Sequence, residues 1–149
     1  MSELPAKVVD ITQLAGYTNK IEELASVSKI MAPTYLKDFI KGQDVATALL
    51  AKAIKADAKA KARLEYLESI AYLEKAKEYL DLKGIKDTSE ARKQYVNIDC
   101  DVVEAKDQKA QTEALVVLFK GKLNGLKQAH DDLKKFTYTD SNMTEYEGM

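Results

Sequence analysis

The chain contains very little of the chemistry on which enzymes usually rely. It has one cysteine, Cys100, and one histidine, His130, among 149 residues. About thirty positions of one expected helix separate them, roughly 45 Å at 1.5 Å per residue, so they cannot form a Cys–His pair. The sequence also lacks zinc-ligand spacing, a phosphate-binding glycine loop and a nucleophile elbow. We therefore predict a protein that binds rather than catalyses, with no cofactor and no metal.

The lone cysteine and the first residues bear on where the protein works. A single cysteine cannot form an internal disulfide, which fits a reducing compartment, and we expect Cys100 to be a small buried or half-buried residue on a helix. Residues 1–10 lack the charged start and apolar run of a signal peptide. No stretch approaches the ~20 apolar residues that a membrane span requires. These features predict a cytoplasmic protein without a membrane partner.

Glycine and proline are scarce as well, with six and two copies, so helices are seldom interrupted. We expect a first short helix over residues 20–31. Pro33 separates it from a second short helix over residues 35–41, which Gly42 ends.

Two long helical segments follow. Residues 45–82 contain no glycine or proline, and Gly84 ends this helix. A second long helix runs from about residue 92 to Phe136, after a capping box made by Asp87 and Glu90. Because the connection is short, the two helices are expected to be antiparallel neighbours. Apolar seams run along both, with an interruption near Lys109: Leu49, Ala53, Ala56, Ala60, Leu64, Leu67 and Ala71, then Ile98, Val102, Ala105, Thr112, Val116, Phe119, Leu123, Leu126, His130 and Leu133.

The predicted fold class is therefore all-α, with two short N-terminal helices followed by a long antiparallel helical hairpin. Residues 1–136 form a single helical domain, and residues 137–149 form a flexible acidic tail. From Asp131 onward five acidic residues outweigh two lysines. Such an end docks on a partner protein, competes for basic residues of the chain, or only improves solubility.

The hydrophobic fraction is 46%, but much of it is alanine. Alanine allows close helix contact and buries little area, so the predicted core is thin. Chains of this kind often gain stability by assembling with copies of themselves. We therefore expect a homo-oligomer.

Positive charge is concentrated on the first long helix, although the net charge of the chain is only −1. At 100° per residue, four cations fall within roughly an 80° arc beside the alanine seam. We call these four residues the basic stripe: Lys52, Lys55, Lys59 and Arg63. A line of cations matches a polyanion backbone, but it is also what a solvated helical face looks like.

Two further side chains lie near this stripe. Lys61 points to roughly the opposite side of the helix, so it cannot join Arg63 on one strand of nucleic acid. Tyr66 and Tyr72 are candidates for stacking on bases, and packing is the alternative role for both.

At this point the sequence resembles a known family. Residues 61–66, Lys-Ala-Arg-Leu-Glu-Tyr, are similar to the Leu-Lys-Ala-Arg-Leu-Asp-Tyr-Tyr element of the bacteriophage recombination mediator UvsY family. The stretch 35–67 has a similar spacing of Tyr, Lys and Leu, and the likeness covers about two-thirds of the chain. Lys61 and Arg63 match the basic residues of the element, and Tyr66 matches its first aromatic.

The sequence departs from that element at three positions. Ala60 replaces the first Leu, Glu65 replaces Asp, and Leu67 replaces the second Tyr. The last change removes an aromatic side chain and so weakens the case for stacking.

The resemblance implies a small, helical, ring-forming protein in the cytoplasm of a bacterial host cell. It implies binding to single-stranded DNA and help for a RecA-type recombinase that displaces single-strand-binding protein. By this interpretation Lys52, Lys55, Lys59 and Arg63 contact phosphates. Lys61 contacts them from a neighbouring subunit or a second surface, and Tyr66 stacks on a base.

Two other interpretations remain open. In the first, the chain is a phage structural component or helical adaptor without nucleic-acid binding, and its apolar seams dock on other proteins. Otherwise it is a small modulator of a host protein that acts through its acidic tail.

Overall fold

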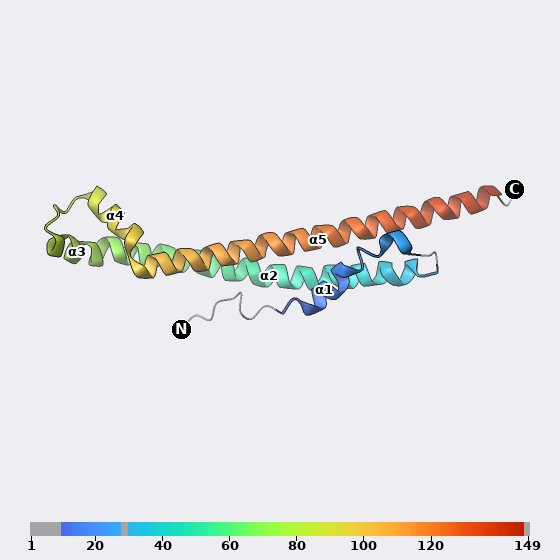
Figure 1. Cartoon of the computed structure of the whole chain (residues 1–149), viewed down its shortest axis with the longest axis horizontal. Coiled ribbons are helices and arrows are strands. Elements are labelled where there is room, and N and C mark those ends of the chain that lie inside the picture. The colour runs from blue at the N-terminus through green and yellow to red at the C-terminus, as the bar shows by residue number, and fades with distance from the viewer. Residues whose placement is uncertain (1–9, 28–29, 148–149) are drawn as a thin grey trace. The chain divides into compact units, whose positions relative to one another are not determined.

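The computed structural model describes the backbone of residues 10–27 and 30–147, and the side chains of that range apart from those of residues 25 and 139–147. Over these residues every regular element is a helix, which confirms the all-α class. The elements are α1 (Thr12–Asn19), a 3₁₀ turn (Leu24–Ser26), α2 (Ala32–Ile70), a π turn (Ala71–Lys75), α3 (Ala76–Lys83), α4 (Ser89–Ile98) and α5 (Cys100–Glu147) (Figure 1).

The chain divides into two compact units. Among the described residues, unit 1 is the segment Ala53–Val116, and unit 2 consists of residues 10–52 and 117–147. Helices α2 and α5 therefore contribute residues to both units.

Unit 1 has a core of mostly small side chains. Its buried apolar residues are Ala53, Ala71, Ala76, Leu80, Val102 and Ala105, and the polar side chain of Thr112 is buried with them. Polar contacts join the two sides of this core: the Thr112 hydroxyl donates to Asp57 at 2.8 Å, and the Lys75 ammonium donates to Asp101 at 2.7 Å. Asp57 near the start of the first segment pairs with Thr112 near the end of the second, and Lys75 at the end of the first pairs with Asp101 at the start of the second. Residues 53–75 and 101–116 therefore run antiparallel.

The turn between α3 and α4 follows from two residues (Figure 1). Gly84 has φ of 66°, the left-handed conformation that glycine adopts without a steric penalty, and it ends α3 as predicted. The N-cap of α4 is Thr88, whose hydroxyl accepts from the Ala91 amide at 3.1 Å. The predicted Asp87–Glu90 capping box is wrong because Asp87 forms a two-pronged ion pair with Arg92 instead, at 2.7 and 2.8 Å.

The second long helix is broken at Asp99, where one continuous helix was expected. Asp99 is extended and its carboxylate accepts from the backbone amides of Asp101 and Val102, so it caps the N-terminus of α5. The break lies ten residues before the interruption predicted near Lys109. It also leaves Ile98 exposed, although the seam placed it in the core.

Unit 2 has larger buried side chains: Leu14, Phe39, Phe119, Leu126 and Leu133. The predicted helix over residues 20–31 is wrong, because α1 lies earlier and residues 24–26 form only a 3₁₀ turn. The second predicted short helix is part of α2, which continues through Gly42.

Gly42 lies inside α2 because another segment approaches it closely. A Cβ at this position would lie 2.8 Å from the Cβ of Tyr17 and 3.1 Å from a methyl carbon of Leu126. The glycine is therefore required for packing and does not end the helix. Pro33 lies in the first turn of α2, where a missing N–H costs no helical hydrogen bond.

The C-terminal segment also differs from expectation. Helix α5 continues to Glu147, whereas irregular chain was predicted after Phe136. Once a helix exists, each added residue contributes one hydrogen bond, and no glycine or proline occurs between Phe136 and Gly148 to stop it. The acidic side chains of Asp140, Glu145 and Glu147 lie outside the described residues.

Candidate nucleic-acid interface

Three members of the basic stripe lie in unit 1 on the surface of α2. We call Lys55, Lys59 and Arg63 the cation row, and all three are exposed. They recur every four residues, which is about 6 Å along the helix axis per step, so the row is about 12 Å long. Lys52, the fourth member of the stripe, is exposed at the end of its segment of unit 2.

The cation row has no acidic partner within the part of the chain that the structure describes. None of its three side chains forms an ion pair or a hydrogen bond there. The only acidic residue between Ala53 and Arg63 is Asp57. Its carboxylate faces the other side of the helix, where it accepts the hydrogen bond from Thr112. The positive charge of the row is therefore uncompensated locally.

Small side chains flank the cation row. Ala51, Ala58 and Ala62 are all exposed and lie beside it on the helical wheel. An alanine border leaves room for a polymer backbone to approach the lysine and arginine heads. Three other cations of unit 1 are paired: Lys75 and Arg92 are tied to aspartates, and Lys109 pairs with Glu113.

Of the two tyrosines named from the sequence, only Tyr66 lies beside the cation row. It is 65% exposed, and its wheel position lies within the arc of the cation row, one turn beyond Arg63. Tyr72 has a structural role. Its hydroxyl donates to Ser89 at 3.1 Å, and the Arg92 guanidinium lies 5.7 Å from its ring centroid.

Lys61 is exposed but does not join the cation row. It lies roughly 180° around the helix from the stripe, on the far side of the buried seam. The structure thus brings together four of the six predicted site residues on one face of unit 1: Lys55, Lys59, Arg63 and Tyr66.

A buried carboxylate at the start of α5 is a feature that the sequence did not reveal. Asp99 is 5% exposed, accepts from the Tyr95 hydroxyl at 2.8 Å, and lies 3.5 Å from the Lys75 ammonium. Burial opposes its ionisation, but the hydrogen bonds from Tyr95 and the Val102 amide, with the charge of Lys75, lower the pKa of Asp99. Burial and the hydrogen bond to Asp99 raise the pKa of Tyr95 to about 12.

This carboxylate is a structural group. It caps a helix and joins α4, α5 and the π turn, so all its hydrogen-bonding capacity faces inward. The sequence signal was an Asp three residues before a buried valine, but an Asp inside a helical pattern is common and did not stand out.

The described residues contain no group of three or more His, Cys, Asp and Glu side chains that could hold a metal ion. Cys100 is exposed rather than buried, because it is the first residue of α5 and faces away from the core. His130 is half-buried, and its Nδ1 lies 3.4 Å from a carboxylate oxygen of Asp131. No helix in the described part of the chain is long and apolar enough to cross a membrane.

Comparison with known proteins adds nothing to these observations, since no family model, no curated protein and no solved structure matches this chain.

Proposed function

We propose that this protein is a non-enzymatic mediator of recombination that binds single-stranded DNA along the cation row. The observation that supports DNA binding is a line of exposed cations on one helix face with no acidic partner among the described residues. The resemblance at residues 61–66 supports the second half of the proposal. By that resemblance, the protein helps a RecA-type recombinase to load on DNA that single-strand-binding protein covers.

The physical basis is the release of counterions from the phosphate chain. Each phosphate that a cation neutralises on a single strand contributes about −0.7 to the slope of log K against log salt. The three cations of the row therefore give a slope of about −2. Tyr66 adds sequence-tolerant stacking, which is worth about 1–3 kcal/mol per base where it occurs.

Assembly extends this proposal. In a homo-oligomer the Lys61 of one copy and the cation row of another come to one strand, although a single helix separates them. The same proposal includes an arrangement of the two units as one long antiparallel hairpin. It also includes a location in the cytoplasm of a bacterial host.

The test is the binding of a fluorescent single-stranded oligothymidylate, followed by anisotropy at several salt concentrations. In the variant Lys55→Glu/Lys59→Glu/Arg63→Glu, affinity at low salt should fall about 100-fold, because three attractive contacts become repulsive. A matched control, Lys86→Glu/Lys120→Glu/Lys122→Glu, makes the same change in net charge at exposed positions outside the row.

The control should keep most of its affinity. If the two triple variants lose affinity equally, the binding depends on the net charge of the chain and not on the cation row in particular. If the native chain shows no salt dependence, the proposal of DNA binding is wrong.

A second candidate function is a helical adaptor without nucleic-acid binding. It is favoured by large apolar side chains left on the surface, among them Leu82 at 80% and Val117 at 70% exposure. Under this alternative, assembly survives the triple substitution of the cation row and no oligonucleotide binds the native chain.

A further inference from the structure

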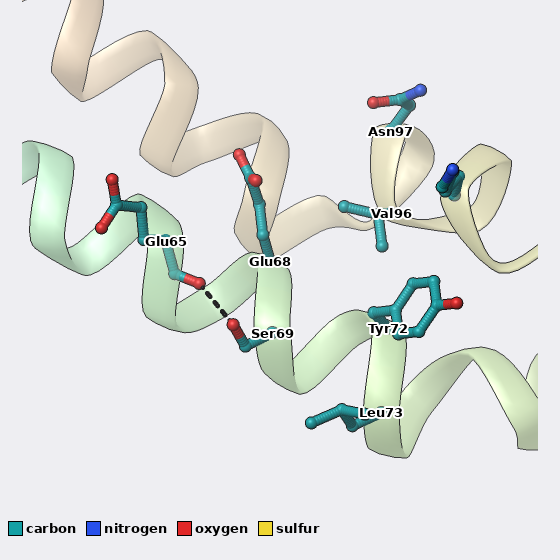
Figure 2. A pocket seen from close by; sticks show the side chains of 8 residues that line it. Glu65, Glu68, Ser69, Tyr72, Leu73, Val96 and Asn97 are labelled. Carbon is teal, nitrogen blue, oxygen red and sulfur yellow. Dashed lines mark hydrogen bonds between the residues drawn. The ribbon is translucent and has the colours of Figure 1, made fainter. Parts of the chain in front are cut away.

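A groove lies on another face of unit 1, between the C-terminal part of α2 with the π turn and α4. Its volume is about 600 Å³, within the usual range of ligand sites. The apolar part of its lining is Tyr72, Leu73 and Val96, and Glu65 and Glu68 lie towards one end (Figure 2). The other charged side chain of the lining is that of Lys93, from α4.

The floor of the groove is held in place by hydrogen bonds. The Tyr72 hydroxyl is fixed by Ser89, and the Tyr72 carbonyl accepts from Arg92 at 3.1 Å. Arg92 is fixed in turn by its two-pronged ion pair with Asp87. A surface that is already ordered loses little conformational freedom when a ligand binds.

The charged groups of the groove are not compensated in this way. Within the described residues, neither Glu65 nor Glu68 has a hydrogen bond or ion pair from its carboxylate. The two lie one turn apart on α2, so their Cβ atoms are about 5–6 Å from each other. Leu73, beside them, is 67% exposed. The groove thus combines an uncovered apolar floor with two carboxylates and the single ammonium group of Lys93, a net negative lining.

This combination selects one class of ligand. The carboxylates repel phosphates, so the groove is not a continuation of the DNA site. On the helical wheel the face that carries Glu65, Glu68 and Tyr72 lies roughly 150° from the cation row. A cation held by Glu65 and Glu68 and a strand on the row therefore do not compete for the same surface.

We propose that the groove binds a short segment of a partner protein in which a Lys or Arg side chain lies next to a large apolar side chain. The cation meets Glu65 and Glu68, and the apolar group packs against Tyr72, Leu73 and Val96. The argument is the complementarity of charge and polarity in this groove, and it does not depend on DNA binding by the cation row.

An array of synthetic peptides tests the proposal with the full chain. In each peptide one Arg and one Leu or Phe are placed at varied spacing in a Gly-Ser background, and a matched set carries Glu in place of Arg. The chain should bind peptides of the Arg set in preference to the Glu set. The tightest of them then serves as the probe in an anisotropy titration.

Substitutions identify the binding surface. Glu65→Gln/Glu68→Gln should weaken probe binding about fivefold, the loss expected for two partly exposed ionic contacts. Leu73→Ser should also weaken it, without disturbing an already exposed position. The control Glu74→Gln/Glu78→Gln changes the same charge at exposed positions outside the groove lining and should leave binding unchanged. Circular dichroism verifies that every variant is folded.

Three results overturn the proposal: no peptide of the Arg set binds, the Glu set binds as well, or the Glu65→Gln/Glu68→Gln variant binds the probe like the native chain. Because no nucleic acid is present in these experiments, they separate this proposal from the proposed DNA binding. The groove variants should retain the oligothymidylate affinity of the native chain.

Discussion

Two groups of charged residues in unit 1 differ in whether they have partners of opposite charge. Around the start of α5, Lys75, Asp99 and Asp101 are joined to each other and to the Tyr95 hydroxyl. Along α2, the cation row has no acidic partner among the described residues. The difference teaches that charge near the break between α4 and α5 makes contacts that maintain the fold, whereas charge on the row makes none among the described residues.

The largest loss of stability is expected when the buried carboxylate of the paired group is removed. Asp99→Ala takes away the N-cap of α5 and leaves the Tyr95 hydroxyl without its acceptor, so the free energy of unfolding should fall by about 2–3 kcal/mol. Asp101→Ala, at an exposed position, should cost less than about 1 kcal/mol. Urea unfolding of both variants measures the difference, and equal losses would contradict the structural role of Asp99.

Alkaline pH should destabilise the same cluster by removing the proton of Tyr95. The pKa of Tyr95 is about 12 in the fold, above its ordinary value of 10, so the native state holds this proton more tightly than the unfolded chain. The stability that the tyrosine contributes is present below pH 10 and is lost as the pH rises through about 12. Unfolding midpoints across this range should fall more steeply for the native chain than for Tyr95→Phe. Parallel curves would show that Tyr95 does not titrate in this way.

A smaller effect is expected at the helix cap after the turn. Thr88→Ala removes the hydrogen bond to the Ala91 amide and should cost about 1 kcal/mol. Glu90→Gln, the other half of the capping box expected from sequence, should change stability by less than about 0.5 kcal/mol. A larger loss of stability for Glu90→Gln than for Thr88→Ala would support the capping box expected from the sequence.

The smallest effect on stability is expected in the cation row itself. Lys59→Gln removes no contact in the described structure, so the free energy of unfolding should change by less than about 0.5 kcal/mol. The slope of log K against log salt for oligothymidylate should become shallower by about 0.7. A marked loss of stability would mean that Lys59 belongs with the paired charges after all.

Local signals in the sequence located some elements well. The helix-forming residues after position 45 and the glycine at position 84 predicted the first long helix and its end, because helix propensity and a left-handed cap act within a few residues. The exposure of the basic stripe also followed from helical periodicity.

Other features depended on contacts between distant residues. Gly42 was taken as a helix end, but its role is set by Tyr17 and Leu126, which the local sequence does not reveal. The cap at Asp99 depends on burial beside Tyr95 and Lys75. The groove needs α4 folded back on the π turn, so its lining could not be assembled from a single helical pattern.

The π turn has a consequence for the length of the chain. Ala71 and Ala76 are both fully buried although five residues separate them, a spacing that an ordinary α-helix would place on different faces. The wider turn absorbs one additional residue and so keeps Leu80 directed at the same core. The helical segment up to Gly84 therefore contains one residue more than a regular α-helix would need to place the same side chains in the core. Removing one residue between positions 71 and 75 would leave an ordinary α-helical step of four residues between the two alanines, so both of them and Leu80 should still face the core.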